Sequence, residues 1–260
     1  MELKPIKVNL DDYPTTLRPY LEDANLYDSS CSADAKVLFS DKDEGYYIKI
    51  SQAGTLQTEA MMTNYFHSLD LSPKVLEYLS IDKDFLVTNK VIGNDCIHPK
   101  YLEQPEKLCD TLAESLRLLH SMSYSNCPVK NRTANYLDTA QKNYIAGVCD
   151  KTLLRQCGFK SPDEAWDFVK TNRSLLKTDT LAHGDYCLPN VILYNWKLSG
   201  LIDVGFGGVS DRHVDIFWGI WSLYHNLKTN AFANRFIDAY GRTLVDDEVL
   251  RLIASIEIFG

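Results

Sequence analysis

Three oxygen-bearing side chains stand close together in the sequence and suit one kind of chemistry. They are Asp185, Asn190 and Asp203. Carboxylate and amide oxygens are hard ligands that Mg²⁺ accepts, so Asn190 and Asp203 are candidate ligands for that ion. Asp185, five residues before Asn190, is then free to face a hydroxyl nucleophile and to accept its proton. Together the three residues predict the Mg²⁺-assisted transfer of a phosphoryl group to a hydroxyl.

A hairpin is the element that must position these groups. Val191–Tyr194 and Leu198–Ile202 are two short apolar runs, and the three residues between them are typical of a tight connection. In an antiparallel hairpin the start of the first strand lies beside the end of the second. Asn190, just before the first strand, and Asp203, just after the second, are therefore expected to lie roughly 5 Å apart.

The same stretch resembles a known family. The catalytic loop of the protein-kinase superfamily has the pattern His-x-Asp with Asn five residues after the Asp, and residues 183–190 (HGDYCLPN) match it. Residues 202–205 (IDVG) resemble its metal-binding Asp-x-Gly. Together with residues 211–216 (DRHVDI), these segments resemble in sequence the aminoglycoside 3′-phosphotransferases, which are bacterial antibiotic kinases.

The resemblance implies a role for each residue of this stretch. Asp185 is the catalytic residue, Asn190 and Asp203 bind Mg²⁺, and His183 and Asp215 are structural supports. The plainer alternative is a chance His-Gly-Asp loop with Asp203 as a turn residue. Both spacings and the hairpin between them would then have to coincide, which argues against it.

The resemblance extends to nucleotide binding. Lys49 lies on an expected strand, Tyr46–Ile50, and is similar to the strand lysine that contacts the α- and β-phosphates in kinases. Glu59, in an expected helix over Thr55–Leu69, matches the glutamate that pairs with that lysine. Ser32 lies where such kinases carry a phosphate-covering loop, although no glycine is present there. The alternatives are solvated surface charges for Lys49 and Glu59, and an ordinary hairpin tip for Ser32.

A hinge between kinase lobes is expected after two further strands, Pro73–Leu76 and Asp84–Thr88. By the same resemblance, the main chain of Asn89 and Val91 hydrogen-bonds the nucleobase, and the lobe boundary falls near Gly93. The phosphoryl donor is expected to be ATP or GTP, and the sequence does not choose between them.

Composition limits the setting. The chain has 260 residues, a formal net charge of −8 and seven cysteines without C-x-x-C pairing, which favours a reducing cytoplasm without a disulfide framework. The negative balance argues against nucleic acid as the main partner. No segment approaches the roughly 18 uninterrupted apolar residues of a membrane span, so no membrane association is expected. A monomer or weak dimer is expected.

The order of the expected elements predicts an α+β fold with two lobes, of the protein-kinase-like type. Residues 1–92 should form a nucleotide-binding lobe from an antiparallel sheet and one helix. Residues 93–260 should form a larger, mostly helical lobe for catalysis and acceptor binding, with a lid near residues 124–160. Its clearest helices are Pro105–Met122, Ser161–Thr171 with Ser161 as N-cap, and Ile216–Leu227, which is apolar nearly all round and expected to be buried.

The acceptor is the less determined half of the function. Residues 255–259 resemble the ending of the antibiotic kinases, which implies substrate contacts for Glu257 and Phe259, whereas Trp221 stands at what looks like a usual arginine position. The lid segment has only Asp138 and Asp150 as acidic residues. Its basic residues are Lys130, Arg132, Lys142, Lys151, Arg155 and Lys160. A basic lid repels a polycation, so aminoglycosides are expected to be poor substrates unless these side chains face solvent.

Three functions remain open. The first is a kinase like the aminoglycoside 3′-phosphotransferases, and the second is a metabolic kinase of the same fold for a sugar or an amino alcohol. The third is a nucleotide-binding module without catalysis, which would have no need to retain Lys49, Asp185, Asn190 and Asp203 together. In the first two cases the partner is a small-molecule hydroxyl acceptor.

Overall fold

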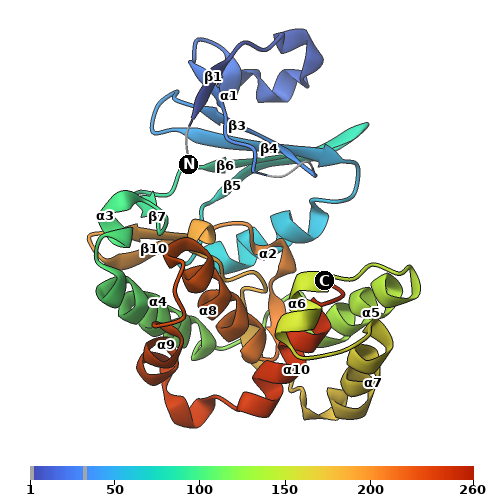
Figure 1. Cartoon of the computed structure of the whole chain (residues 1–260). Coiled ribbons are helices and arrows are strands. Elements are labelled where there is room, and N and C mark those ends of the chain that lie inside the picture. The colour runs from blue at the N-terminus through green and yellow to red at the C-terminus, as the bar shows by residue number, and fades with distance from the viewer. Residues whose placement is uncertain (1–2, 32–33) are drawn as a thin grey trace. The chain divides into compact units, whose positions relative to one another are not determined.

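The chain folds into two compact units. The computed structural model describes residues 3–31 and 34–260. One unit comprises residues 1–98 and 191–205, and the other comprises residues 99–190 and 206–260 (Figure 1). The expected boundary near residue 92 treated the lobes as consecutive segments. In the structure the first unit is not one consecutive segment. The later residues 191–205 belong to it, because a strand in this segment pairs with residues 94–95.

The first unit is built on an antiparallel sheet of six strands in the order β1-β2-β3-β4-β6-β5. The strands are β1 (Lys4–Ile6), β2 (Leu26–Asp28), β3 (Lys36–Ser40), β4 (Tyr46–Gln52), β5 (Val75–Ser80) and β6 (Lys83–Asn89). The sequence predicted β4 and β6 well, but it placed β5 too early. It also missed α1 (Arg18–Leu21) and the helical turns before it. Leu17, just before α1, and Leu21, at its end, fill the core on one face of the sheet.

Helix α2 (Gln57–His67) confirms the predicted helix after β4. A buried carboxylate fixes where the chain enters it, because Asp84 accepts from the N–H groups of Gly54 (2.9 Å) and Leu56 (2.7 Å). Burial raises the pKa of Asp84, but these hydrogen bonds and others outweigh it and hold the pKa below its usual value. Leu56 and Ala60 pack on Leu86 of the sheet, which fixes the rotation of the helix.

The predicted hairpin is present. Strand β9 (Val191–Tyr194) pairs with β10 (Lys197–Leu201), and Val191 lies opposite Leu201. Asn195 and Trp196 connect the strands with φ values of +51° and +62°, the left-handed pair of a type I′ turn. On its other side β9 pairs with β7 (Asn94–Asp95), which ties the hairpin to the first unit.

The second unit is mainly helical. Its helices are α3 (Pro99–Leu102), α4 (Pro105–His120), α5 (Arg132–Ile145), α6 (Lys151–Gln156), α7 (Pro162–Asn172), α8 (His213–Leu227), α9 (Ala233–Tyr240) and α10 (Asp247–Glu257). A two-stranded sheet of β8 (Thr180–Ala182) and β11 (Gly208–Ser210) lies among them. Helices α5, α6 and α7 group with α10 (Figure 1). Ser161 caps α7 as predicted, because its Oγ accepts from the N–H of Glu164 at 3.2 Å.

Helix α8 differs from its prediction in one respect. Its inner face is buried, but Trp221 is 37% exposed and Tyr224 is 41% exposed, so the helix is not covered all round. An apolar sequence on every side of a helix does not show which side a neighbour covers. In the described ranges, no helix combines the length and the hydropathy needed to cross a membrane.

Candidate active site

The residues after β8 form a loop held by one buried carboxylate. Asp215, in the first turn of α8, accepts from the main-chain N–H of His183 and from that of Gly184, both at 2.7 Å. His183 and Asp215 have no exposed surface. A buried carboxylate with several donors fixes the groups that it binds, because losing any of them would leave its charge unpaired. Asp215 therefore sets the path of the chain into Asp185.

A histidine outside the loop completes this support. His120, at the end of α4, is 3.0 Å from Asp215 through Nε2 and 2.8 Å from the Tyr240 hydroxyl through Nδ1. Nothing in the local pattern connects residue 120 with residue 215, because the contact depends on how α4 packs against α8 and α9.

The glycine of the His-Gly-Asp motif is required by the backbone. Gly184 has φ +86°, and a Cβ on it would lie 2.0 Å from the carbonyl oxygen of Phe206. Neither the dihedral nor the space admits a side chain. The close approach turns the chain so that the N–H of Asp185 donates to Nδ1 of His183 at 3.2 Å.

Asn190 orients the Asp185 side chain. Its Nδ2 donates to the carboxylate oxygen Oδ2 of Asp185 at 2.9 Å and to the Asp185 carbonyl at 3.0 Å. The amide nitrogen is therefore committed to Asp185, and the amide oxygen is the atom of Asn190 that suits a hard cation. Asn190 is buried, which restricts its rotamers and so the direction of the carboxylate.

In the first unit, one lysine holds two carboxylates. Lys49 Nζ lies 2.9 Å and 2.8 Å from the two carboxylate oxygens of Glu59, and 2.8 Å from Oδ1 of Asp203. The predicted Lys49–Glu59 pair is thus present. Burial lowers the pKa of Lys49, but the two negative charges outweigh it and raise that pKa above its usual value.

Asp203 combines a strained backbone with an accessible side chain. Its φ is +57°, a left-handed conformation that a non-glycine residue rarely adopts, and its side chain is 49% exposed. Such strain gathers at functional sites when the surrounding structure fixes it. Oδ1 is taken by Lys49, so Oδ2 is the oxygen that suits a cation.

The structure says less about the other three residues that were expected to bind nucleotide, which are Ser32, Asn89 and Val91. Ser32 lies outside the described residues. The N–H of Asn89 donates to the carbonyl of Lys74 at 3.2 Å, so a nucleobase contact by Asn89 would use its carbonyl. Val91 packs its side chain against Gly200 of β10.

Glu257, at the end of α10, forms the centre of a polar cluster near the catalytic loop. Its Oε1 accepts from the Tyr136 hydroxyl at 2.7 Å and from Nε1 of Trp218 at 3.0 Å. Burial raises the pKa of Glu257, the two hydrogen bonds oppose the rise and the charge of Asp185 adds to it, and together they bring the pKa to about 7. Tyr136 and Trp218 were not singled out from the sequence, because isolated aromatic residues carry no signal of a shared partner.

The prediction that Phe259 contacts the substrate is corrected by the structure. Phe259 has no exposed surface. Its ring lies edge-on to those of Tyr144 and Trp166, at centroid distances of 5.5 Å and 5.6 Å. Its carbonyl accepts from Nδ2 of Asn143 at 2.8 Å. Phe259 is therefore a core residue that ties the segment after α10 to helices α5 and α7.

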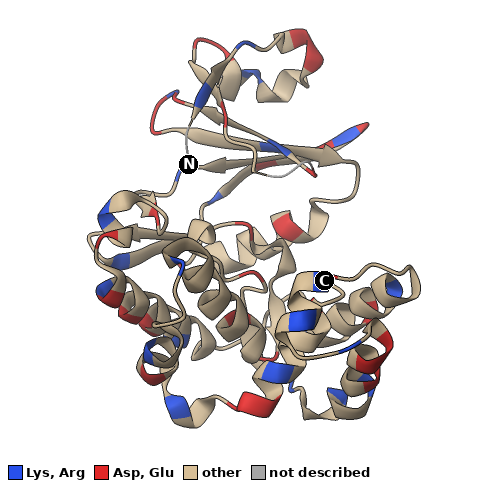
Figure 2. Cartoon of the chain, viewed as in Figure 1, with Lys and Arg blue, Asp and Glu red and all other residues tan. Residues whose placement is uncertain are grey.

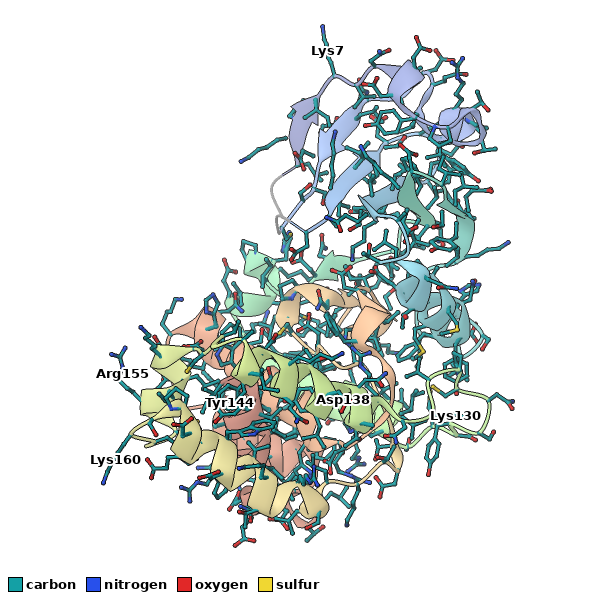
Figure 3. All side chains as sticks on the ribbon, turned by 90° about the vertical axis from the view of Figure 1, so that its right-hand side faces the viewer. Lys7, Lys130, Asp138, Tyr144, Arg155 and Lys160 are labelled. Atoms are coloured by element: carbon teal, nitrogen blue, oxygen red, sulfur yellow. The ribbon has the colours of Figure 1, made fainter. Side chains whose placement is uncertain are left out.

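The basic side chains of the lid segment mostly face solvent. Lys142, Lys151, Arg155 and Lys160 are exposed, and Figure 3 shows Arg155 and Lys160 extending outward. Two acidic residues, Asp163 and Glu164, follow closely in the first turn of α7. Figure 2 shows both basic and acidic residues in this region. Side chains that face solvent do not line an acceptor site, so the exposed lysines and arginine give no reason to expect that the lid rejects polycations.

Arg132 is the exception among these basic residues. It is half-buried, its guanidinium carbon lies 5.2 Å from the centroid of the Phe206 ring, and burial lowers its pKa.

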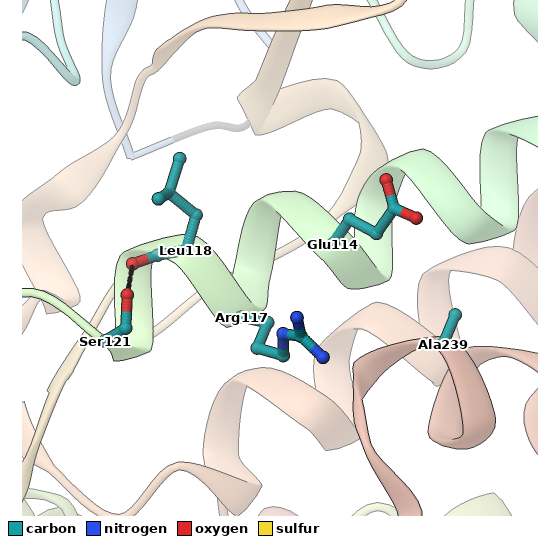
Figure 4. Close-up of a pocket in the computed structure, with 5 residues that line it drawn as sticks. All are labelled: Glu114, Arg117, Leu118, Ser121 and Ala239. Atoms are coloured by element: carbon teal, nitrogen blue, oxygen red, sulfur yellow. Dashed lines mark hydrogen bonds between the residues drawn. The ribbon is translucent and has the colours of Figure 1, made fainter.

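A separate shallow pocket between α4 and α9 is lined by Glu114, Arg117, Leu118, Ser121 and Ala239 (Figure 4). Its one marked hydrogen bond, from Ser121 Oγ to the Leu118 carbonyl at 2.7 Å, is internal to the end of α4, and we assign no chemistry to it.

The donor set suits Mg²⁺ carried by a nucleotide better than a resident metal centre. Across the described ranges, no three His, Cys, Asp or Glu side chains gather as a metal cluster. Mg²⁺ in phosphoryl-transfer enzymes is commonly held by one or two protein oxygens together with phosphate oxygens and waters. The side-chain oxygen of Asn190 and Oδ2 of Asp203 each lie outside the hydrogen bonds described above, and each is an oxygen of the type that such an ion accepts.

A sheet-based unit with a Lys–Glu pair and a helical unit with a braced His-Gly-Asp loop define a phosphotransferase of the protein-kinase-like fold. The chain belongs to the phosphotransferase enzyme family, whose model matches residues 27–253. It is 42% identical, over 99% of each chain, to a probable aminoglycoside 3′-phosphotransferase of Lactococcus lactis subsp. lactis (strain IL1403). An aminoglycoside 3′-phosphotransferase of Niallia circulans is 28% identical over 68% of this chain and 67% of the other.

Solved structures show the same fold. The crystal structure of a type VIII aminoglycoside-3′-phosphotransferase has a TM-score of 0.74 at 23% identity, and covers 96% of this chain and 99% of the other. An aminoglycoside phosphotransferase of Streptomyces rimosus, in complex with ADP and streptomycin, has a TM-score of 0.76 at 19% identity and covers 97% of this chain and 99% of the other. The predicted α+β, bilobal protein-kinase-like fold and the family resemblance are confirmed.

Proposed function

We propose that this phosphotransferase moves the γ-phosphoryl group of ATP or GTP to a hydroxyl of an aminoglycoside-like or sugar-like small molecule. The observation that carries the proposal is the fixed Asp185 carboxylate, oriented by Asn190 on a loop that Asp215 braces. The relative of Lactococcus lactis supports the class of acceptor, because its name is that of an aminoglycoside kinase and its similarity spans nearly the whole chain.

Each residue has a distinct task in this reaction. Asp185 orients the acceptor hydroxyl through Oδ1 or Oδ2 and takes its proton as the oxygen attacks phosphorus. Lys49, aimed by Glu59, offers its ammonium to the phosphates of the nucleotide. Asn190 and Asp203 are the proposed Mg²⁺ ligands, and the bound ion offsets negative charge on the phosphate oxygens. His183 and Asp215 keep the loop in place without touching the reacting atoms.

A metabolic kinase for a sugar or an amino alcohol is the second candidate. One observation favours it: Glu257, whose charge interacts with that of Asp185, is partly neutralised by its raised pKa. A site for a polycation needs several ionised carboxylates. The candidate without catalysis is disfavoured, because both hydrogen bonds of the Asn190 amide go to Asp185 and one of them orients its carboxylate.

A screen of acceptors tests the proposal. Nucleotide turnover is measured with MgATP and with MgGTP, against aminoglycosides, neutral glycosides, amino sugars and amino alcohols. We expect acceptor-dependent turnover with at least one class, and phosphate on a hydroxyl of the product by mass spectrometry and ³¹P NMR. Thermal stabilisation by MgATP without turnover in any class would contradict a kinase. Turnover restricted to amino alcohols would favour the second candidate.

A further inference from the structure

Arg132 is a half-buried cation without a partner of opposite charge. Its guanidinium group lies over the Phe206 ring, 5.2 Å from the ring centroid, and within residues 3–31 and 34–260 it forms no ion pair with a carboxylate. Burial lowers the pKa of Arg132, and no acidic group in these ranges opposes that change. Removing a cation from water is costly unless an anion pairs with it, so this arginine suits an anion that arrives from solution.

The position of Arg132 is fixed by the packing of the chain around it. Helix α5 begins at Arg132, because the Asn131 side chain accepts from a main-chain N–H of the first turn at 3.0 Å. The chain just before the helix runs beside β11, where the N–H of Val209 donates to the Val129 carbonyl at 2.8 Å. A Cβ on Gly208 would lie 2.7 Å from Cγ1 of Val129, so the two segments are in close contact. These contacts hold the start of α5 beside the residues that follow the Asp-x-Gly motif.

Phe206 joins Arg132 to the catalytic loop. A Cβ on Gly184 would lie 2.0 Å from the carbonyl oxygen of Phe206 and 2.8 Å from its Cβ. Gly184 directly precedes Asp185, so the Phe206 side chain begins in contact with the loop that carries the proposed base. Its ring is 59% exposed, and the guanidinium group of Arg132 lies over it. All four residues belong to the second unit, so their arrangement does not depend on the first.

The start of helix α5 adds to the positive charge. Main-chain N–H groups give the N-terminus of a helix a partial positive charge, which disfavours a cation there. Arg132 is nevertheless the first residue of α5, and the first turn of this helix contains no acidic residue. The fold thus keeps a cation where both burial and the helix dipole disfavour it, which indicates that the charge serves a ligand.

A phosphoryl group matches Arg132 in charge and in shape. The planar guanidinium group has several N–H donors, and two phosphate oxygens can accept from two of them at once. Contact with the face of an aromatic ring does not use these donors. In the part of the chain that the structure describes, no hydrogen bond engages them. A cationic acceptor would be repelled by Arg132, whereas the phosphoryl group is attracted to it.

We propose that Arg132, supported by Phe206, binds the phosphoryl group while it is transferred. In that step the acceptor oxygen forms a bond to phosphorus, and the bond from phosphorus to the bridging oxygen of the leaving nucleoside diphosphate breaks. The proton of the acceptor hydroxyl passes to Asp185. Arg132 donates hydrogen bonds to the non-bridging oxygens and keeps all its protons. The proposal rests on the proposed function, because it adds a charge-stabilising residue to the same reaction.

The test compares Arg132→Ala with Arg155→Ala, which removes an exposed arginine of the same lid segment. Turnover is measured with MgATP and the acceptor that reacts fastest in the screen, and MgADP binding is measured by calorimetry. We expect kcat of Arg132→Ala to fall by about tenfold to a hundredfold, because a group that offsets charge in the transition state is lost. The affinity for MgADP should be unchanged, and Arg155→Ala should match the native protein in both measurements.

Guanidinium ion distinguishes a lost charge from a disturbed fold. Added at a concentration far below the denaturing range, it should restore part of the lost turnover in Arg132→Ala and leave Arg155→Ala unaffected. A variant that is inactive because its packing has changed would not regain turnover in this way. Arg132→Lys keeps the charge without the planar fork, so its kcat should lie between those of Arg132→Ala and the native protein.

Binding of inorganic phosphate in the presence of MgADP, followed by ³¹P NMR, needs no turnover. We expect the native protein to bind phosphate about tenfold more tightly than Arg132→Ala. Equal kcat in Arg132→Ala and Arg155→Ala would overturn the proposal and leave the proposed function intact, as would a loss of kcat without guanidinium rescue and with unchanged phosphate binding. Phosphate binding that depends on Arg132, without turnover against any acceptor, would keep the anion site and reject the proposed function. Neither turnover nor Arg132-dependent phosphate binding would reject both.

Discussion

At the scale of single residues, the active-site charges are shared. Lys49 binds Glu59 and Asp203 together, so its ammonium position is a compromise between two carboxylates. Asp203 also stays in a left-handed conformation that costs of order 1–3 kcal/mol. In the proposed function, both features leave Asp203 able to exchange Lys49 for Mg²⁺ bound with the nucleotide, and Glu59 keeps Lys49 in place.

Replacing Glu59 tests this sharing. In Glu59→Gln the lysine keeps only one full counter-charge and is drawn toward Asp203, so its ammonium no longer points at the phosphates. We expect KM for MgATP to rise about tenfold, or roughly 1.4 kcal/mol of binding free energy. Steady-state kinetics measures the change. Glu44→Gln, at an exposed loop position, is the control and should have no effect; equal KM values in both variants would reject the role of Glu59.

The pKa of Glu257 predicts a pH dependence of stability. Its folded-state pKa of about 7 lies above the ordinary value of 4.5. The folded protein therefore keeps a proton that the unfolded chain releases, so this group contributes full stability below pH 4.5 and loses it as the pH rises through about 7. Relative to Glu257→Gln, the native protein should lose on the order of 2 kcal/mol of unfolding free energy over that range. Urea unfolding across the range measures this difference. Parallel pH curves for the two proteins would contradict the assignment.

At the scale of elements, the sequence predicted those helices and strands that depend on interactions between residues close together in the chain. The hairpin β9–β10, the capped helix α7 and the long helix α4 follow from turn residues, an N-cap serine and a regular apolar stripe. The exposed face of α8 did not follow, because exposure depends on which neighbours pack against it. The contacts of His120 with Asp215 and Tyr240 also escaped prediction, because they join helices far apart in the sequence.

The end of α8 offers a test at this scale. Lys228 caps the helix in a left-handed conformation with φ +57° and is exposed. Glycine adopts this conformation without steric cost, so Lys228→Gly should raise the free energy of unfolding by about 0.5–1 kcal/mol. Chemical denaturation gives the value. Lys228→Ala, which removes the same side chain but retains a Cβ, should bring no such gain; equal stability of both variants would show that the cap is not strained.

At the scale of the whole molecule, the chain crosses between two units more than once. The sequence predicted two lobes, but it could not show that residues 191–205 return to the first unit, because pairing between β7 and β9 joins segments almost a hundred residues apart. The catalytic motif therefore spans the point of return: Asp185 and Asn190 belong to the second unit, and Asp203 belongs to the first. The proposed Mg²⁺ ligands were predictable as residue types, but their distribution over the units was not.

Gly93 tests the return of the chain. It has φ +125°, and a Cβ there would lie 2.3 Å from the carbonyl oxygen of Leu193 in β9. Gly93→Ala should therefore cost about 2–4 kcal/mol of unfolding free energy, through backbone strain and overpacking together. Gly54→Ala is the control, since Gly54 also has a positive φ but no atom within 4 Å of the added Cβ. The loss, measured by denaturation, should be clearly larger for Gly93; equal losses would show that the β7–β9 junction yields easily.

The central claim is that Asp185 accepts the proton of a hydroxyl during phosphoryl transfer. The most direct measurement compares turnover and nucleotide affinity in Asp185→Ala with those of the native protein, using the best acceptor from the screen. We expect turnover to fall by a factor of about 10²–10⁴, as is typical when a general base is removed, while the Kd for MgATP stays within about threefold. Turnover within tenfold of the native protein, with the nucleotide still bound, would contradict the account.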